Sequence, residues 1–162
     1  MPGAPGYLAA MAPRDATARP WFDGPRPRLF AHRGSSGTAP ENTMEAFAEA
    51  LEAGADRLEL DVHVSADGHV VVFHDDDLDR TTDGSGPLRS RTLRELKALD
   101  AGFRFRAEDG SLAFRGRGVR IPLLDEVLEA FPATPLNVEV KADEGRGVEA
   151  FFAALDRHGA RE

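Results

Sequence analysis

Three short apolar runs, each followed by polar residues, constrain the fold of this chain more than any other feature. The runs cover residues 29–31, residues 58–62 with a continuation at 70–75 across a tight turn, and residues 136–141. Runs of this length are typical of buried strands, and amphipathic helical patterns separate them. Strands that alternate with helices favour parallel βαβ units, in a doubly wound sheet or in part of a barrel. Polar residues at the strand ends are therefore the first candidates for function.

Capping signals define the expected order of elements, which is β-α-β-hairpin-α-α-β-α. Asn42 is expected to cap the first helix, with Glu45 as its capping-box partner, and Thr92 and Glu95 repeat that pattern further on. The remaining expected elements are strands at 28–33, 57–64 and 136–141 and helices at 123–131 and 148–158.

A hairpin is expected between the second strand and residues 69–74. Asp67 and Gly68 form a dipeptide typical of two-residue hairpin turns. With that turn as the centre, paired residue numbers sum to about 135, which places His74 opposite Asp61. The turn therefore predicts that a histidine returns to the acidic part of the second strand.

Composition narrows the classes of function. The chain has 162 residues, of which 41% are apolar, and this suits one globular domain. Its formal net charge of −8 argues against nucleic acid or an anionic membrane as a general partner. No cysteine is available for disulfides, and no window approaches the ~20 apolar residues of a membrane span. We expect residues 1–27 to be a mobile Pro/Gly-rich leader, residues 28–162 to form the domain, and the compartment to be the cytoplasm.

The second strand carries a carboxylate pair. Glu59 and Asp61 are two positions apart, so they share a face, and Glu139 has the same parity on the third strand. Close carboxylates repel unless a cation compensates them, and oxygen donors of this kind suit Mg²⁺ or Ca²⁺. Taken alone, the pair is better explained as the wet face of a half-exposed strand. The histidines and cations that accompany the pair make a metal site the hypothesis to test.

Two histidines and two cations accompany these carboxylates. His32 and His74 are candidates for general acid and base, because imidazole titrates near neutral pH. Arg33 offers a bidentate fork for a phosphate, and Lys141 could add positive charge to the same group. The acidic run at 75–83 lacks the spacing of a calcium-binding loop and is expected to be a solvated loop. The other histidines, His63, His69 and His158, are expected to be surface or packing residues.

Several motifs together resemble the glycerophosphodiester phosphodiesterase family. The matching segments are residues 31–34 (AHRG), 39–43 (APENT), 59–62 (ELDV), 72–75 (VFHD), 78–84 (LDRTTDG), 121–128 (IPLLDEVL) and 137–141 (NVEVK). The resemblance covers residues 29–141 in the family's order. It implies an α/β fold of the TIM-type (β/α) barrel kind.

The resemblance also implies an activity and a set of roles. The activity is hydrolysis of a small glycerophosphodiester to glycerol 3-phosphate and an alcohol, with one divalent cation, Mg²⁺ or Ca²⁺. Metal ligands would be Glu59, Asp61 and Glu139; His32 and His74 would perform acid–base catalysis; Arg33 and Lys141 would bind substrate.

The length departs from the family pattern. A complete barrel needs eight βα units in ~250 residues, and only about three units and a hairpin can be assigned here. The barrel is therefore expected in part, with an open sheet edge that self-association could cover. The alternatives are a non-catalytic remnant that binds metal or a partner, and a phosphodiesterase resembling phospholipase C or sphingomyelinase D.

Overall fold

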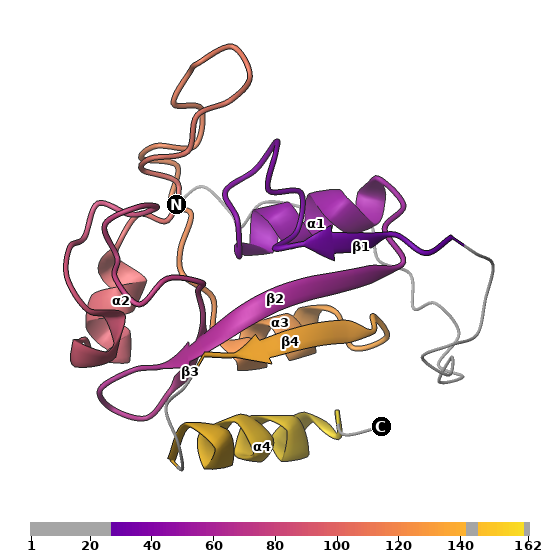
Figure 1. Cartoon of the computed structure of the whole chain (residues 1–162), viewed down its shortest axis with the longest axis vertical. Helices are drawn as coiled ribbons and strands as arrows, with labels where there is room; N and C mark the ends of the chain where they lie inside the picture. Colours follow the sequence, from indigo (N-terminus) through magenta and orange to yellow (C-terminus); the bar gives the residue numbers. More distant parts are fainter. Residues whose placement is uncertain (1–26, 142–145, 161–162) are drawn as a thin grey trace, which may run out of the picture.

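A computed structural model describes residues 27–141 and 146–160 of the chain. The leader predicted at residues 1–27 lies outside the described residues apart from Pro27, so the division into domains stays a prediction. Within the described ranges, strands and helices alternate in the predicted order (Figure 1).

The sheet is built around β2, Arg57–Val64, which pairs with the three other strands. The strands β1, Phe30–His32, and β4, Leu136–Val140, lie parallel to β2 on opposite edges, because Leu58 pairs with a residue of each. The strand β3, Val70–Val72, returns antiparallel beside the last residues of β2. The carboxyl ends of the three parallel strands therefore meet at one end of the sheet.

Helices cover one face of this sheet. They are α1, Met44–Glu52, α3, Leu124–Ala130, and α4, Arg146–His158. The alternating residues Leu58, Leu60 and Val62 of β2 point into the core that these helices close. Since side chains of a strand alternate between faces, Glu59 and Asp61 must lie on the opposite face.

The segment between β3 and α3 forms a second, smaller core. It contains the 3₁₀ turn η2, Leu88–Ser90, and α2, Leu93–Ala98, and its apolar residues pack on Val71. Figure 1 shows this segment beyond the carboxyl ends of the strands, with a loop that projects from it. No described helix has the length and apolar character that crossing a membrane requires.

The hairpin differs from the predicted one by a single residue. Ser65 and His69 form the closing pair, so the loop has three residues and Gly68 adopts a φ of 86°. Val62 pairs with Val72, and paired numbers sum to 134. A type I turn followed by a left-handed glycine gives this longer loop. Phe73, not His74, therefore donates its backbone N–H to the carbonyl of Asp61, at 2.9 Å.

The start of α1 is also corrected. Thr43 is the N-cap, because its hydroxyl accepts a hydrogen bond from the N–H of Ala46, whereas Asn42 has a φ of 56° and points toward β2. The prediction of Asn42 as the cap was wrong by one residue, since either side chain suits a cap. The second capping box, formed by Thr92 and Glu95, is confirmed.

Candidate active site

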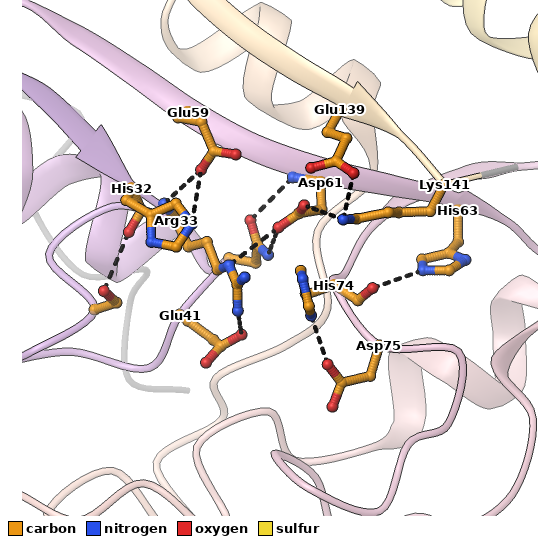
Figure 2. A network of polar contacts seen from close by, with 12 residues as sticks. His32, Arg33, Glu41, Glu59, Asp61, His63, His74, Asp75, Glu139 and Lys141 are labelled. Atoms are coloured by element: carbon orange, nitrogen blue, oxygen red, sulfur yellow. Dashed lines mark hydrogen bonds and ion pairs between the residues drawn. The ribbon is translucent and has the colours of Figure 1, made fainter.

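Three carboxylates come together on the face of the sheet that the helices leave open. Glu59 and Asp61 project from β2, and the parallel register places Glu139 of β4 directly beside Asp61. One carboxylate oxygen from each residue lies within 4.8 Å of the others. Figure 2 shows the three side chains near one another, two from β2 and one from β4. Three oxygen donors this close could hold a hard divalent cation such as Mg²⁺ or Ca²⁺.

Asp61 is the buried centre of this group. Its side chain is only 1% exposed, and its Oδ2 accepts a hydrogen bond from Asn42 Nδ2 at 3.0 Å. The backbone N–H of Asp61 donates to Asn42 Oδ1 at 3.4 Å. A buried carboxylate needs such partners because its desolvation is costly. Arg33 Nε and Lys141 Nζ each lie 3.3 Å from it, so cations flank Asp61 on two sides.

Lys141 follows β4 and bridges two of the carboxylates. Its Nζ lies 2.6 Å from Glu139 Oε1, and its backbone N–H donates to the carbonyl of Val62. The hydrogen bond to Glu139, with a further contribution from Asp61, raises the pKa of Lys141, so its ammonium is charged at neutral pH. The structure therefore brings Lys141 to the carboxylates.

Arg33 leaves β1 in a conformation that few L-residues adopt. Its φ is 57°, and its backbone N–H donates to Glu59 Oε2 at 3.0 Å. Gly34 follows with a φ of 79°, and a Cβ there would lie 2.6 Å from the carbonyl carbon of Ala46. Strained residues of this kind often mark functional sites. The close approach to α1 holds Arg33 against the carboxylates.

The two predicted histidines lie on different sides of Arg33 (Figure 2). The side chain of His32 is 68% exposed, and its Nε2 is 3.9 Å from Glu59 Oε2. His74 is more enclosed, and its Nδ1 lies 2.6 Å from Asp75 Oδ1. Buried His63 donates from Nε2 to the carbonyl of His74 at 3.0 Å, so it supports the backbone at this point.

Glu41 and Asp75 are functional candidates that the sequence reasoning missed. Glu41 Oε1 accepts from Arg33 Nη1 at 2.9 Å, and Arg80 binds both carboxylates. Burial raises the pKa of Glu41, but hydrogen bonds from Arg80 and Arg33 outweigh burial and lower it overall. The hydrogen bond from Arg80 is also the main cause that lowers the pKa of Asp75 to about 2. Both carboxylates are therefore ionised at neutral pH.

The acidic run was expected to be a solvated loop, but several of its carboxylates have partners in the fold. Asp79 accepts from the backbone N–H of Gly86 at 2.8 Å, and Asp83 accepts from that of Asp100 at 2.8 Å. An Asp next to a Gly or a turn is the sequence signal that predicts such bonds from backbone N–H groups to side chains.

His158 was expected at the surface or in packing, and its Nε2 contacts Asp125 Oδ1 of α3 at 3.0 Å.

The amino-acid sequence matches a known protein family over most of its length. The sequence profile described as the glycerophosphoryl diester phosphodiesterase family matches residues 32–151. The chain belongs to this family. A glycerophosphodiester phosphodiesterase of Caldanaerobacter subterraneus is 46% identical over 116 residues, which are 70% of this chain and 45% of that protein. A human protein named lysophospholipase D is 41% identical over 118 residues, covering 70% of this chain and 36% of its own length.

Solved structures of the family have the same fold. The glycerophosphoryl diester phosphodiesterase domain of a Mycobacterium tuberculosis protein has a TM-score of 0.77 and 35% identity, covering 83% of this chain and 49% of that one. A phosphodiesterase of Oleispira antarctica, solved with the product sn-glycerol 3-phosphate, has a TM-score of 0.72 and 40% identity over 82% of this chain and 53% of its own.

These similarities settle the fold class. The described residues form part of a TIM-type (β/α) barrel, and the predicted fold is confirmed. The chain spans about half the length, or less, of the relatives named above.

Proposed function

We propose that this protein hydrolyses glycerophosphodiesters to glycerol 3-phosphate and an alcohol, as a metal-dependent phosphodiesterase. The observation that carries the proposal is the gathering of three carboxylates, two histidines and a partly buried arginine toward the carboxyl ends of the parallel strands β1 and β4, with His74 supplied by the segment after β3. Active sites of (β/α) barrels lie at this end of the strands. Membership of the family supports the same chemistry.

Glu59, Asp61 and Glu139 are the proposed metal ligands. The donor set fits a hard divalent cation, because all three donors are carboxylate oxygens within 4.8 Å of one another. A bound Mg²⁺ or Ca²⁺ would polarise the phosphoryl oxygens and stabilise negative charge as the diester is cleaved. Lys141 contacts two of the three ligands and would share their charge with the cation.

Arg33 and Lys141 are the proposed phosphate-binding residues. Arg33 Nε is buried and has no hydrogen-bond partner among the described residues, although Asp61 lies 3.3 Å away. A buried donor without an acceptor is costly, and a phosphoryl oxygen at this position would satisfy it. Lys141 brings an ammonium to the same region.

His32 and His74 are the proposed acid and base. One would remove a proton from the attacking oxygen, and the other would protonate the leaving alkoxide of the alcohol. His74 donates from Nδ1 to Asp75, which leaves Nε2 as its reactive nitrogen. The partner of His32 is Glu59, at 3.9 Å. Both histidines therefore lie beside a carboxylate.

Glycerol 3-phosphate release from glycerophosphocholine is the test. We expect release that depends on Mg²⁺ or Ca²⁺, stops with chelator, and is lost in His32→Ala and His74→Ala. His69→Ala is the matched control, because His69 is an exposed histidine that closes the hairpin opposite Ser65. The human relative is named lysophospholipase D, so a lysophospholipid is a second candidate substrate, and release of choline from lysophosphatidylcholine would indicate that activity.

Self-association and location are proposed with this function. Leu29 and Phe30 are large apolar residues that are more than two-fifths exposed at β1, and a second copy could cover them. Light scattering after size-exclusion chromatography tests self-association, and fractionation of the producing cell tests a cytoplasmic location.

The alternative function is a non-catalytic remnant that binds metal. A folded protein that binds metal but shows no turnover would favour it.

A further inference from the structure

Arg80 joins two carboxylates from separate parts of the chain. Its Nη1 donates to Glu41 Oε2 at 2.7 Å, and its Nη2 donates to Glu41 Oε1 at 2.7 Å. On its other side, Nε donates to Asp75 Oδ2 at 2.6 Å and Nη2 donates to Asp75 Oδ1 at 3.0 Å. The guanidinium therefore holds both carboxylates through both of their oxygens. Only arginine has the planar set of donors that this arrangement requires.

Each of these carboxylates in turn contacts a residue of the proposed machinery. Glu41 Oε1 accepts from Arg33 Nη1 at 2.9 Å, and Asp75 Oδ1 lies 2.6 Å from His74 Nδ1. The contacts run without a gap from Arg33 through Glu41, Arg80 and Asp75 to His74. Figure 2 shows Glu41 and Asp75 on the same side of the site, each against its partner.

We propose that Arg80 is a positioning residue, which fixes the proposed phosphate-binding Arg33 and the proposed acid–base His74 relative to each other. The inference rests on the proposed function for the roles of these two residues. The hydrogen bonds of the Arg80 guanidinium go to Glu41 and Asp75, so Arg80 acts on Arg33 and His74 through these two carboxylates.

Geometry distinguishes this network from an ordinary surface ion pair. The side chain of Arg80 is 48% exposed, and an isolated pair at such a site contributes little. Here, however, both partners are bound through two oxygens and are themselves mostly enclosed. Hydrogen bonds from Arg80 also lower the pKa of both carboxylates, which keeps the network charged at neutral pH.

The network has a separate consequence at each end. At His74, a fixed Asp75 selects the tautomer with the proton on Nδ1, and so directs Nε2 to the reaction. At Arg33, Arg80 shares the charge of Glu41. Without Arg80, Glu41 would pair with Arg33 alone and would compete with a phosphate for its donors.

The first test measures the tautomer of His74 in the full chain by ¹⁵N NMR, at a pH where the ring is neutral. We expect the Nδ1–H tautomer in the native protein and a mixture of tautomers in Arg80→Gln. Arg80→Lys should not restore it, because an ammonium cannot bind both carboxylates through two oxygens each. Arg89→Gln is the matched control, since Arg89 pairs with Asp76 of the same segment at 3.1 Å.

The second test measures binding of glycerol 3-phosphate, in the presence of Mg²⁺, by calorimetry. Arg80→Gln should weaken binding about 3- to 10-fold, and Arg89→Gln should leave it unchanged. If Arg80→Gln does not fold, Asp75→Asn tests the histidine arm and Glu41→Gln tests the arginine arm separately. The proposal is overturned if the tautomer of His74 and the affinity for glycerol 3-phosphate both stay unchanged in Arg80→Gln. Where Arg80→Gln does not fold, the same result in Asp75→Asn and Glu41→Gln overturns it.

Failure of the proposed function has a different signature. Neither the tautomer nor the affinity measurement requires turnover. A native protein that binds glycerol 3-phosphate but releases none from glycerophosphocholine therefore contradicts only the proposed activity. Where turnover is present, Arg80→Gln should lower kcat more than the loss of affinity raises KM, because a misplaced proton donor or acceptor affects the chemical step.

Discussion

Replacing Gly34 with alanine should destabilise the protein strongly, because two independent costs fall on one residue. Gly34 has a φ of 79°, and an L-residue there loses ~1–2 kcal/mol. The added Cβ would also lie 2.6–2.8 Å from the carbonyl group and the Cβ of Ala46, none of whose atoms can rotate away. Overpacking of this kind costs ~1–3 kcal/mol. We expect the free energy of unfolding to fall by about 2–5 kcal/mol.

Gly68 offers a matched control for this prediction. Its φ of 86° is similar, but nothing lies within 4 Å of a Cβ built there. Gly68→Ala should therefore show the conformational cost alone, ~1–2 kcal/mol, reduced by the lower entropy of its unfolded state. Urea unfolding followed by circular dichroism measures both variants; at ~1–2 kcal/mol/M the midpoints should differ by about 1 M. Equal midpoints would refute the role of the contact with Ala46.

Three further predictions concern charge and capping. The pKa of Asp75 is lowered from 3.8 to about 2, so the stability it contributes is present above pH ~4 and is lost as the pH falls through 2; Asp75→Asn should flatten the dependence of Tm on pH in that window. Thr92→Ala removes the cap that pairs with Glu95, and should lower the free energy of unfolding by ~1 kcal/mol in urea. Mg²⁺ or Ca²⁺ should raise Tm in a titration, and Asp61→Asn should abolish that rise.

The sequence was most informative where one alternation decided several properties at once. Apolar residues at positions 58, 60 and 62 had to face the helices, which forced Glu59 and Asp61 onto the open face. The same parity on the third strand placed Glu139 in the group, and the structure brings the three together. Alternation does not depend on the position of a strand in space, so it could be used before any fold was known.

Features that depend on one residue of register were less predictable. Asp67 and Gly68 suit a two-residue turn, but a three-residue loop uses the same glycine, and sequence alone does not separate them. Asn42 and Thr43 are both good caps, and the choice follows from the carboxylate that Asn42 reaches on β2. Local propensity leaves such alternatives open until the tertiary contact is known.

The network through Arg80 could not be predicted from the sequence, for a different reason. Its contact with Glu41 spans 39 residues, and no periodicity connects the two segments. Glu41 lies beside Asn42, which favours an interpretation of both as helix-start residues, and Asp75 lies in an acidic run that resembles a solvated loop. One signal was available: Asp75 directly follows the candidate site residue His74.

The charges of the site and of the Arg80 network do not cancel unless a metal is bound. The site and its network contain the carboxylates of Glu41, Glu59, Asp61, Asp75 and Glu139 and the cations of Arg33, Arg80 and Lys141. With neutral histidines, this leaves an excess of two negative charges, which would oppose a phosphodiester anion. A divalent cation removes that excess, so binding of the metal and of the phosphate should favour each other. The three cations alone cannot make the site attractive to its proposed substrate, because each of them is already paired with the carboxylates that it positions.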